Sequence, residues 1–238
     1  MPLFTVNIAT YNQLPSLKVI LAALEFQTVK DFEVIVTDDG SSDGTKEWAK
    51  GQNFKYFWQE DEGFRIAKSK NMGIKAAEGE YFVSLEADVI PHFRLLEEYK
   101  AHMRPNRVAL GVRHDIEELP ESIDFKTLDK NILSMDWRMD NLRRIRNIER
   151  PWRLCSGCNV AFPTQLLRDI GGWNEAFKHY GIDDYEVCLR MLMAGCDIIA
   201  LPAAYGYHVR HALRETVPDN LYILERLESQ HEDSNRVR

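Results

Sequence analysis

The first hundred residues alternate between short apolar runs rich in β-branched residues and segments with helical periodicity. Runs of this kind predict buried strands, and the segments between them predict helices. The predicted strands are 3–8, 32–37, 54–59 and 81–85, and the predicted helices are 15–27, 43–50, 65–77 and 91–103. This alternation is typical of an α/β fold with a Rossmann-like, mostly parallel central sheet and helices on both faces.

Polar residues follow each of the four predicted strands. The four clusters are Thr10-Tyr11-Asn12, Asp38-Asp39-Gly40, Asp61-Glu62-Gly63 and Glu86-Ala87-Asp88. In open α/β sheets, ligands bind outside the carboxyl ends of the strands. Because parallel strands end at the same edge of the sheet, we expect these clusters to contribute to one site.

The second half of the sequence is less regular. Residues 115–150 are polar and predicted to be partly helical, and 171–181 form an aromatic-rich loop. The elements predicted here are a strand at 158–163, helices at 163–170 and 183–195, and two short strands in 196–209 that are broken at Pro202. The polar end of the chain, 226–238, predicts a flexible tail. No convincing linker separates these parts, so we expect one domain over 1–238.

Composition narrows the class of protein. The chain has 238 residues, of which 45% are apolar, and its 30 Lys and Arg against 37 Asp and Glu give a formal net charge of −7. This acidic balance argues against nucleic-acid binding, which favours a basic face. No run approaches the ~20 apolar residues of a membrane span, and the N-terminus has no signal-peptide pattern. We therefore expect a cytoplasmic protein.

Four cysteines are present, and two of them, Cys155 and Cys158, have the spacing of a zinc or redox motif. One such pair supplies only two of the four ligands of a structural zinc site. Without a secretory signal, reduced thiols are the expected state. Buried or near-surface thiols are therefore the favoured interpretation.

The loop after the second predicted strand reads VTDDGSSDGT. Clusters of Asp, Gly and Ser are ordinary turn chemistry. A calcium loop that begins at Asp39 is excluded because its twelfth position is Lys50, where a bidentate Glu is required. A phosphatase-type motif is excluded because Ser41 stands in place of an Asp. Besides a plain turn, a loop that hydrogen-bonds a polar heterocycle or a ribose remains open.

Glu86 and Asp88 form a pair of carboxylates one residue apart at a strand end. Such a pair can chelate Mg²⁺ or Mn²⁺, which prefer oxygen ligands. A solvated acidic turn before a helix explains the same residues equally well. Either His208 or His211, near the C-terminus, can complete a metal shell that Asp88 begins.

Asp183, Asp184 and Glu186 crowd the start of a predicted helix. Crowding of carboxylates raises the pKa of one member, which can then act as a general base. Acidic residues are also favoured at helix N-termini for electrostatic reasons alone. Both interpretations remain open from these residues taken by themselves.

Taken together, these segments resemble the inverting family 2 glycosyltransferases of the GT-A fold. The resemblance lies in VNIATYN with DFEVIVTDDGSSDGT, in DEGFRIAKSKNMGIKAAEGEYFVSLEADVIP, and in GGWNEAFKHYGIDDYEVCLRMLMAGC. The third segment is most similar to the galactosyltransferase-like branch, which includes bacterial chondroitin-polymerase domains. The similarity covers about residues 3–105 and 151–211.

The resemblance implies a role for each matching residue. Asp184 is the expected general base, and Asp88 and His208 are the expected ligands of Mn²⁺ or Mg²⁺. The expected donor-binding residues are Thr10, Tyr11, Asn12, Asp39, Asp61, Arg65, Asn71, Glu86 and Ala87. The expected acceptor-binding residues are Trp173, Tyr180 and Asp183. It also implies that about 1–110 bind the nucleotide sugar and about 111–215 carry the acceptor site and the base.

The sequence departs from the family pattern at two points. The metal motif, usually Asp-x-Asp, reads Glu86-Ala87-Asp88, and the base motif, usually Glu-Asp, reads Asp183-Asp184. Both changes keep the charge and move one carboxylate by a methylene. Because the last carboxylate of the metal motif is normally the ligand, we expect Asp88 to keep this role, and the role of Glu86 stays open.

The expected function is metal-dependent transfer of a hexose or N-acetylhexosamine from a nucleotide-diphosphate sugar, with UDP favoured. The expected acceptor is a hydroxyl of a glycan or of a lipid-linked or protein-linked acceptor in polysaccharide or glycan assembly. The alternatives are a non-catalytic nucleotide-sugar-binding protein and a sugar nucleotidyltransferase. A basic stretch, 143–153, can contact a phosphate, an acidic sugar or the inner face of a membrane, or can be a solvated helix face.

Overall fold

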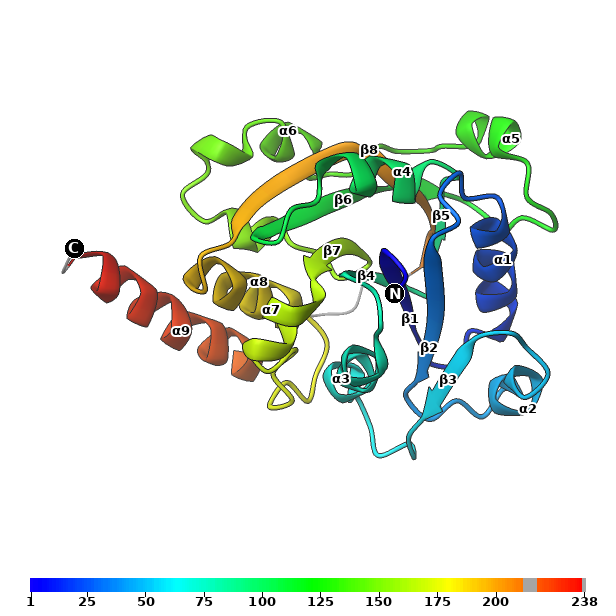
Figure 1. The fold of residues 1–238 in the computed structure, drawn as a ribbon, viewed down its shortest axis with the longest axis horizontal. Helices are drawn as coiled ribbons and strands as arrows, with labels where there is room; N and C mark the ends of the chain where they lie inside the picture. Colours follow the sequence, from blue (N-terminus) through cyan, green and yellow to red (C-terminus); the bar gives the residue numbers. More distant parts are fainter. Residues whose placement is uncertain (212–217, 237–238) are drawn as a thin grey trace.

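The apolar runs of the sequence form the strands of one eight-stranded sheet with the order β3-β2-β1-β4-β7-β6-β8-β5 (Figure 1). The computed structural model describes residues 1–211 and 218–236. Its strands are β1 Phe4–Thr10, β2 Phe32–Asp38, β3 Lys55–Trp58, β4 Tyr81–Glu86, β5 Val89–Pro91, β6 Arg107–Ile116, β7 Asn159–Pro163 and β8 Asp197–Val209. Four of the seven strand pairings are parallel: β1 with β2 and β4, β2 with β3, and β6 with β8. The predicted α/β fold class with a mostly parallel sheet is confirmed.

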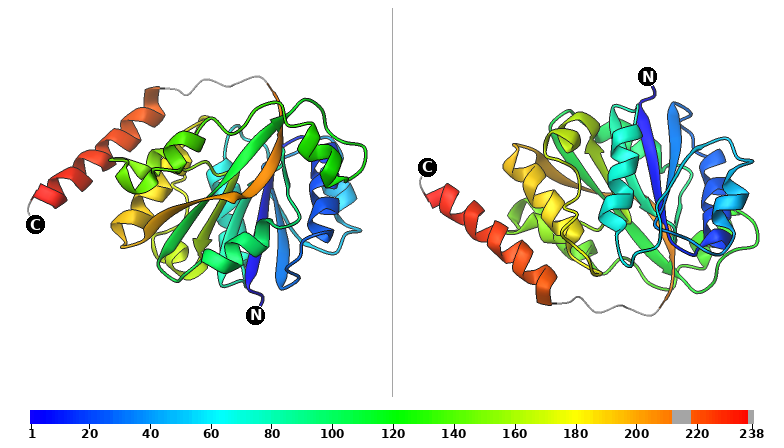
Figure 2. Two further views of the ribbon diagram at one scale, coloured as in Figure 1. Left: turned by 90° about the horizontal axis from the view of Figure 1, so that it is seen from above. Right: turned by 90° about the horizontal axis from the view of Figure 1, so that it is seen from below.

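Helices cover both faces of this sheet. They are α1 Leu14–Glu25, α2 Thr45–Ala49, α3 Ile66–Ala76, α4 Leu95–His102, α5 Phe125–Lys130, α6 Met139–Leu142, α7 Thr164–Asp169, α8 Asp183–Met193 and α9 Pro218–Arg236, with 3₁₀ turns η1 Ile145–Asn147 and η2 Pro151–Leu154. The view from above in Figure 2 shows α4 in front of the strands, and the view from below shows α3 and α8 in front. The two faces of the sheet are therefore buried beneath different helices.

Side-chain alternation along the strands divides the core between these two layers. On β4, Val83 and Leu85 pack in the cluster that contains the apolar faces of α1 and α4, whereas Phe82 packs with α3, α7 and α8. Successive side chains of a strand point to opposite faces, so a strand buried on both sides is apolar along its whole length. This requirement explains the continuous apolar runs from which the strands were predicted.

Three local predictions were wrong. Pro91 does not begin a helix over 91–103, because it ends the short strand β5, and α4 starts at Leu95. Strand β6 was missed between the predicted helix 91–103 and the partly helical segment 115–150. The two strands predicted around Pro202 are one strand, β8, whose register against β6 shifts between Leu110 and Val112. The sequence signal at Pro202 marks this irregularity and not a strand end.

The chain is helical in α9 over much of the segment that was predicted to be a flexible tail from 226 onward. Glu228 is buried and accepts hydrogen bonds from the indole of Trp152 at 2.7 Å and from Arg153 at 2.7 Å and 2.5 Å. Arg150 forms a further ion pair with Glu228 at 3.3 Å. Part of the basic stretch 143–153 is therefore neutralised by α9.

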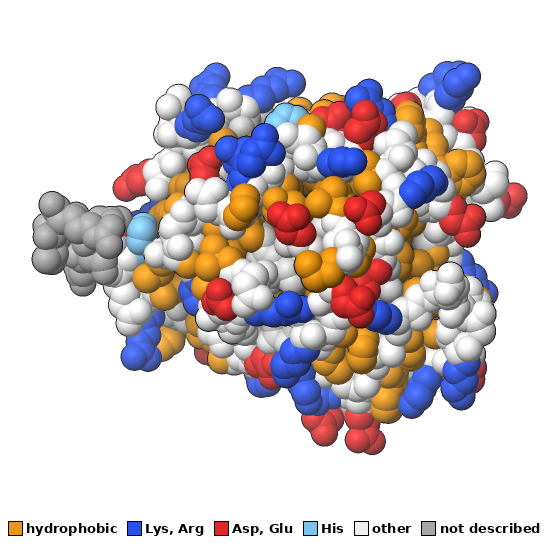
Figure 3. Space-filling model, viewed as in Figure 1, with side chains coloured by type: hydrophobic (Ala, Val, Ile, Leu, Met, Phe, Trp, Pro, Cys, Tyr) orange, Lys and Arg blue, Asp and Glu red, His pale blue; other side chains and the backbone are white. Residues whose placement is uncertain are grey.

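The surface seen in Figure 3 is of mixed charge. Lys and Arg side chains are interspersed with Asp and Glu on this face and form no continuous basic area. Among the described helices, none combines the length and the apolar character that a membrane span requires.

Candidate active site

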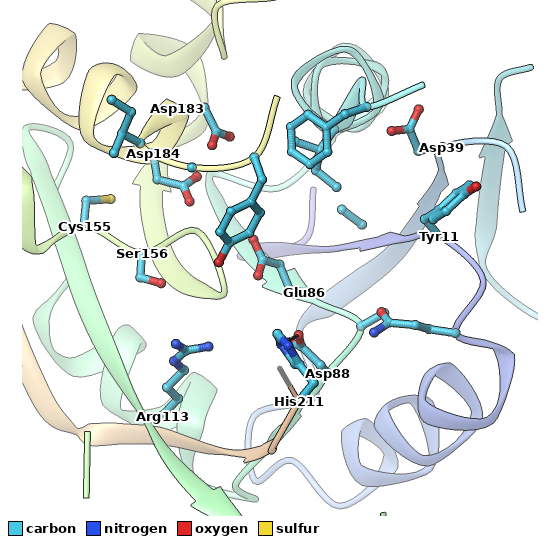
Figure 4. A pocket seen from close by; sticks show the side chains of 18 of the residues that line it. Tyr11, Asp39, Glu86, Asp88, Arg113, Cys155, Ser156, Asp183, Asp184 and His211 are labelled. Atoms are coloured by element: carbon cyan, nitrogen blue, oxygen red, sulfur yellow. Dashed lines mark ion pairs between the residues drawn. The ribbon is translucent and has the colours of Figure 1, made fainter. Parts of the chain in front are cut away.

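A pocket of about 870 Å³ opens where the strands β1, β2 and β4 end and where α8 begins. Figure 4 shows Tyr11 from the end of β1 and carboxylates from the ends of β2 and β4 and from the start of α8 around it. The predicted site residues that line it are Tyr11, Asp39, Asp61, Glu86, Ala87, Asp88, Tyr180, Asp183 and Asp184. The predicted clustering of strand-end residues into one site is therefore what the structure shows, and the volume lies within the range of small-molecule pockets.

One end of the pocket is formed by Asp39 and Tyr11. Asp39 is almost fully buried and accepts hydrogen bonds from Gln59 at 2.5 Å and from the backbone N–H of Arg65 at 2.8 Å. Burial raises the pKa of Asp39, although these hydrogen bonds oppose the effect. The Tyr11 hydroxyl donates to Asp61 at 3.0 Å, which fixes a half-exposed ring beside the Asp39 carboxylate. Carboxylates and a planar ring in this arrangement suit a polar heterocycle and its sugar.

Thr10 and Asn12 hold this end together from outside the pocket. Thr10 is buried, and its carbonyl accepts from the backbone N–H of Asp39 at 3.0 Å. Asn12, with a positive φ of 52°, accepts at Oδ1 from the backbone N–H of Ser42 at 2.8 Å. Both residues therefore position the loops after β1 and β2, and neither of them lines the pocket.

Arg65 and Asn71 also point away from the pocket. The Arg65 guanidinium is engaged by the carbonyl of Glu60 and the carboxylate of Glu62. Asn71 exchanges hydrogen bonds with the backbone of Trp173, donating to its carbonyl at 2.8 Å and accepting from its N–H at 2.8 Å. In the structure these side chains hold neighbouring loops, and neither of them lines the pocket.

The carboxylate of Asp88 lies beside two imidazoles at the end of β8. Its Oδ2 is 3.3 Å from Nε2 of His211 and 3.8 Å from Nε2 of His208. Within residues 1–211 and 218–236, these three are the one group of His, Cys, Asp or Glu close enough together to hold a metal ion. The register explains the convergence, because Val89, next to Asp88, pairs with His208 across β5 and β8.

Asp115 orients His208. Its Oδ1 is 2.9 Å from Nδ1 of His208, and the two residues are paired across β6 and β8. Burial, together with the charge of Arg113, holds the pKa of His208 below its usual value despite the nearby acids. A neutral imidazole that donates from Nδ1 to Asp115 directs the lone pair of Nε2 toward Asp88, which is the arrangement of a metal-binding histidine and its outer partner.

Two buried atoms indicate that this group fits a divalent cation. In the described part of the chain, neither Nε2 of His208 nor Oδ1 of Asp88 has a hydrogen-bond partner, although both are shielded from solvent. Buried polar atoms without partners are rare and call for an explanation. Asp88 and His208 therefore each have an unused lone pair next to the His211 imidazole. One carboxylate and two imidazoles are suitable ligands for Mn²⁺, and a carboxylate alone is the usual protein ligand of Mg²⁺.

Asp184 is held by three donors at the first turn of α8. Its Oδ1 accepts from Lys70 at 3.1 Å and from the indole of Trp173 at 2.9 Å, and its Oδ2 accepts from the backbone N–H of Gly157 at 2.8 Å. A Cβ at position 157 would lie 2.2 Å from Oδ1, so only glycine permits this approach. The carboxylate is therefore fixed in orientation, with lone-pair capacity left on Oδ2.

Lys70 is buried beneath the acids of the pocket. In addition to Asp184, its ammonium lies 3.5 Å from Glu86 and 3.9 Å from Asp183. Burial alone would lower the pKa of Lys70, but the three carboxylates raise it above its usual value. Burial and the neighbouring Asp184 raise the pKa of Asp183 to about 7, against the opposing effect of Lys70. One cation thus links the metal motif on β4 to the acid pair on α8.

Of the two aromatic residues expected to bind a sugar, only Tyr180 lines the pocket. Trp173, expected to stack on a sugar, is 1% exposed and packs against Phe82 and Phe162. Tyr180 is 39% exposed and lines the pocket as predicted. Trp137, which the sequence analysis did not select, also lines the pocket and is 69% exposed. The exposed rings at the α8 side of the pocket are therefore Tyr180 and Trp137.

The CxxC spacing does not correspond to a metal or redox site in the described structure. All four cysteines are free and buried, as the favoured interpretation predicted. Burial raises the pKa of Cys158 to about 11, so its thiol stays protonated. The glycine between Cys155 and Cys158 is the residue that contacts Asp184.

A curled, mostly parallel α/β sheet with helices on both faces matches the GT-A class of glycosyltransferase folds. A carboxylate that could hold a metal ion follows β4, and an acid pair begins α8. Residues 5–171 match the profile of Glycosyl transferase family 2, and residues 141–212 match the N-terminal domain of galactosyltransferase. The chain belongs to glycosyl transferase family 2.

Curated relatives include two synthases and a glucosyltransferase. The chain is 29% identical to chondroitin synthase of Escherichia coli over 90% of its own length and 36% of the synthase. It is 26% identical to hyaluronan synthase of Pasteurella multocida over 90% of its length and 25% of that protein. It is 27% identical to validoxylamine A glucosyltransferase of Streptomyces hygroscopicus subsp. jinggangensis over 88% of its length and 56% of the enzyme. The chain thus spans about a third or less of the two synthases.

Solved structures share the fold. Residues 1–349 of S. aureus TarS in complex with UDP align with a TM-score of 0.67 at 24% identity, covering 94% of this chain and 63% of that one. The mannosyltransferase PcManGT from Pyrobaculum calidifontis in complex with GDP-Man and Mn²⁺ aligns with a TM-score of 0.60 at 20% identity, covering 95% and 69%. At these identities the likeness establishes the fold alone.

Proposed function

We propose that the protein transfers a hexose or N-acetylhexosamine from a nucleotide-diphosphate sugar to an acceptor hydroxyl, with inversion at the anomeric carbon. The donor we favour is a UDP-sugar, and the context is polysaccharide or glycan assembly. The acceptor is a glycan or a lipid-linked or protein-linked sugar. The observation that carries the proposal is the position of Asp184 in the same pocket as Asp39 and the group of Asp88, His208 and His211.

The donor side follows from the strand ends. A uracil ring beside Tyr11 would donate its ring N–H to the Asp39 carboxylate, whose hydrogen bonds from Gln59 and Arg65 leave lone pairs unused. Asp88 and His208 would hold Mn²⁺ or Mg²⁺ with His211. When bound, such a cation neutralises the charge that develops on a departing diphosphate. Glu86 lies between Asp88 and Asp184 in Figure 4, where it would contact the ribose or the transferred sugar.

The acceptor side follows from the start of α8. Asp184 would accept the proton of the attacking hydroxyl at Oδ2, while Lys70 and Trp173 keep the carboxylate in place at Oδ1. Inversion needs the base and the leaving group on opposite sides of the anomeric carbon, and Asp184 lies across the pocket from Asp88 in Figure 4. Tyr180 and Trp137 would bind sugar faces, and Asp183 would bind an acceptor hydroxyl.

The test is a screen of UDP-, GDP- and dTDP-sugars for binding and slow hydrolysis, with and without Mn²⁺. We expect binding of a UDP-sugar that strengthens with Mn²⁺ and turnover that requires the metal. If none of these nucleotide sugars binds in either condition, the proposed donor class is wrong.

The variant Asp184→Asn separates catalysis from binding. We expect it to bind the donor as the wild type does and to lose transfer to the acceptor by a factor of ~10² or more. Unchanged turnover would favour another base, and donor binding without turnover by the wild type would favour a non-catalytic binding protein. Release of pyrophosphate from a nucleoside triphosphate and a sugar phosphate would favour the nucleotidyltransferase alternative.

A further inference from the structure

Arg113 enters the pocket from β6, a strand that the sequence analysis missed. Asp115, two residues along the same strand, contacts His208, so Arg113 and Asp115 share the face that is directed toward the metal-binding group. Figure 4 shows the Arg113 side chain pointing into the pocket beside Ser156 and on the side of Asp88 and His211 that is far from Asp39. The residue therefore lies beyond the expected nucleoside position.

The guanidinium of Arg113 differs from the other arginine of the pocket in having no fixed partner. Arg138 donates to Asp136 at 2.5 Å, to the carbonyl of Leu154 at 2.7 Å and to that of Gly111 at 3.2 Å, so its donors are occupied. In the residues that the structure describes, the Arg113 guanidinium forms neither an ion pair within 4.0 Å nor a hydrogen bond. Its donors are available to a ligand.

The surroundings keep Arg113 charged. Burial opposes the charge, but the nearby carboxylates of Asp88 and Glu86 outweigh this effect and hold the pKa of Arg113 above its usual value. A guanidinium is a planar fork of five donors that matches the oxygens of a phosphate or a carboxylate in pairs. A half-buried, charged guanidinium without a partner among the described residues is therefore prepared for an oxyanion.

We propose that Arg113 binds an oxyanion of the substrates beside the group of Asp88, His208 and His211. The inference rests on the proposed function and deepens it. The oxyanion is either a phosphate of the donor diphosphate or the carboxylate of an acidic acceptor sugar. In both cases the four carboxylates around the reacting centre, Glu86, Asp88, Asp183 and Asp184, would repel the incoming anion, and Arg113 counteracts this repulsion at the point of contact.

The experiment compares three purified variants with the wild type in the presence of Mn²⁺. Arg113→Gln removes the charge, Arg113→Lys keeps the charge without the fork, and Arg143→Gln is a control that removes an exposed arginine whose nearest carboxylate, Asp140, is 3.8 Å away. Calorimetry measures the binding of uridine, UDP and inorganic pyrophosphate. A competition assay compares the binding of p-nitrophenyl β-glucuronide with the binding of p-nitrophenyl β-glucoside. Thermal melting checks that each variant is folded.

If the oxyanion is a donor phosphate, Arg113→Gln lowers the affinity for UDP and for pyrophosphate at least about tenfold. The affinity for uridine stays unchanged. If the oxyanion is an acceptor carboxylate, the variant lowers the affinity for the glucuronide by a similar factor and leaves the affinities for UDP and the glucoside unchanged. In either case Arg113→Lys recovers part of the affinity and Arg143→Gln has no effect. Binding of UDP, pyrophosphate and the glucuronide within twofold of the wild type, or no binding of them by the wild type, overturns the inference. Normal UDP binding in Arg113→Gln with normal glucuronide binding would leave the proposed function intact.

Discussion

Replacement of Lys70 by methionine is the perturbation that tests the electrostatics of the site most directly. Methionine keeps most of the apolar stem but removes the ammonium that lies 3.1 Å from Asp184, 3.5 Å from Glu86 and 3.9 Å from Asp183. The lysine side chain is 1% exposed, so water cannot take the place of the lost charge. Three carboxylates would then share a buried space with no cation between them.

The distances set the magnitude. At an effective dielectric constant of about 20, charges 3.1 Å apart attract by about 5 kcal/mol and charges 3.9 Å apart by about 4 kcal/mol, before desolvation is subtracted. Removal of one partner from a buried ion pair costs about 3–5 kcal/mol. For a chain of 238 residues, this cost corresponds to a decrease in Tm of roughly 6–20 °C.

The loss must depend on pH, because the carboxylates can reduce their repulsion by binding protons. Burial and Asp184 already raise the pKa of Asp183 to about 7, above its value of about 4 in an unfolded chain. Without Lys70, folded-state pKa values in this group rise further. A group whose folded pKa is raised contributes stability below the unfolded pKa and loses it as pH rises through the folded pKa. The stability deficit of Lys70→Met is therefore smallest near pH 5 and grows toward pH 8.

The assay is a set of thermal melts of the wild type, Lys70→Met, Lys70→Arg and Lys68→Met between pH 5 and 8. Lys68 is an exposed lysine on the same helix, so its variant controls for the loss of charge alone. Lys70→Arg retains the charge and should recover most of the loss at high pH. A Tm deficit of Lys70→Met that stays the same within about 2 °C from pH 5 to 8 would refute the electrostatic argument and leave only a packing effect.

Three further predictions concern separate parts of the molecule. Asp88→Ala should reduce metal-stimulated donor hydrolysis ~10²-fold or more. It should leave uridine binding unchanged, since Asp88 lies apart from Asp39. Metal stimulation that is retained in kinetic assays would rule out Asp88 as a metal ligand. Trp137→Ala should raise the acceptor KM about fivefold or more without changing donor hydrolysis, because the exposed ring lines the pocket; an unchanged KM would exclude it from acceptor binding. Glu228→Gln should lower the free energy of unfolding by about 1–3 kcal/mol in urea titrations, since it weakens the charge-assisted hydrogen bonds from Arg153. A loss below about 0.5 kcal/mol would mean that α9 docks through apolar contacts alone.

The sequence predicted the donor edge of the site well because its information is local. The strands β1 and β4 are buried on both faces, so each apolar run ends where the chain reaches the edge of the sheet. The polar residues at that point, such as Asp39 and Asp88, are therefore displaced into the pocket by the geometry of parallel strands. No long-range information was needed to place them together.

The residues that were missed depend on long-range packing. Lys70 lies on α3 two positions after the exposed Lys68, and no local pattern shows which of the two faces Asp184. Arg113 lies within β6, whose position follows from pairing with β7 and β8, more than forty residues away in sequence. Trp173 and Trp137 have the same side chain, and only the packing of Trp173 against Phe162 shows which ring is accessible. These assignments require the tertiary structure.

The CSGC segment shows how a motif can carry a different requirement from the one that its spacing indicates. The spacing of Cys155 and Cys158 indicates a metal or redox site, but both thiols are buried and free. The residue of this segment that cannot be substituted without disturbing the site is Gly157. Its backbone N–H donates to Asp184 at 2.8 Å, and its carbonyl accepts from Ser84 at 2.9 Å. A side chain there would displace the Asp184 carboxylate, since its Cβ would lie 2.2 Å from Oδ1. The segment is therefore constrained by the close approach of its backbone to the proposed base and not by sulfur chemistry.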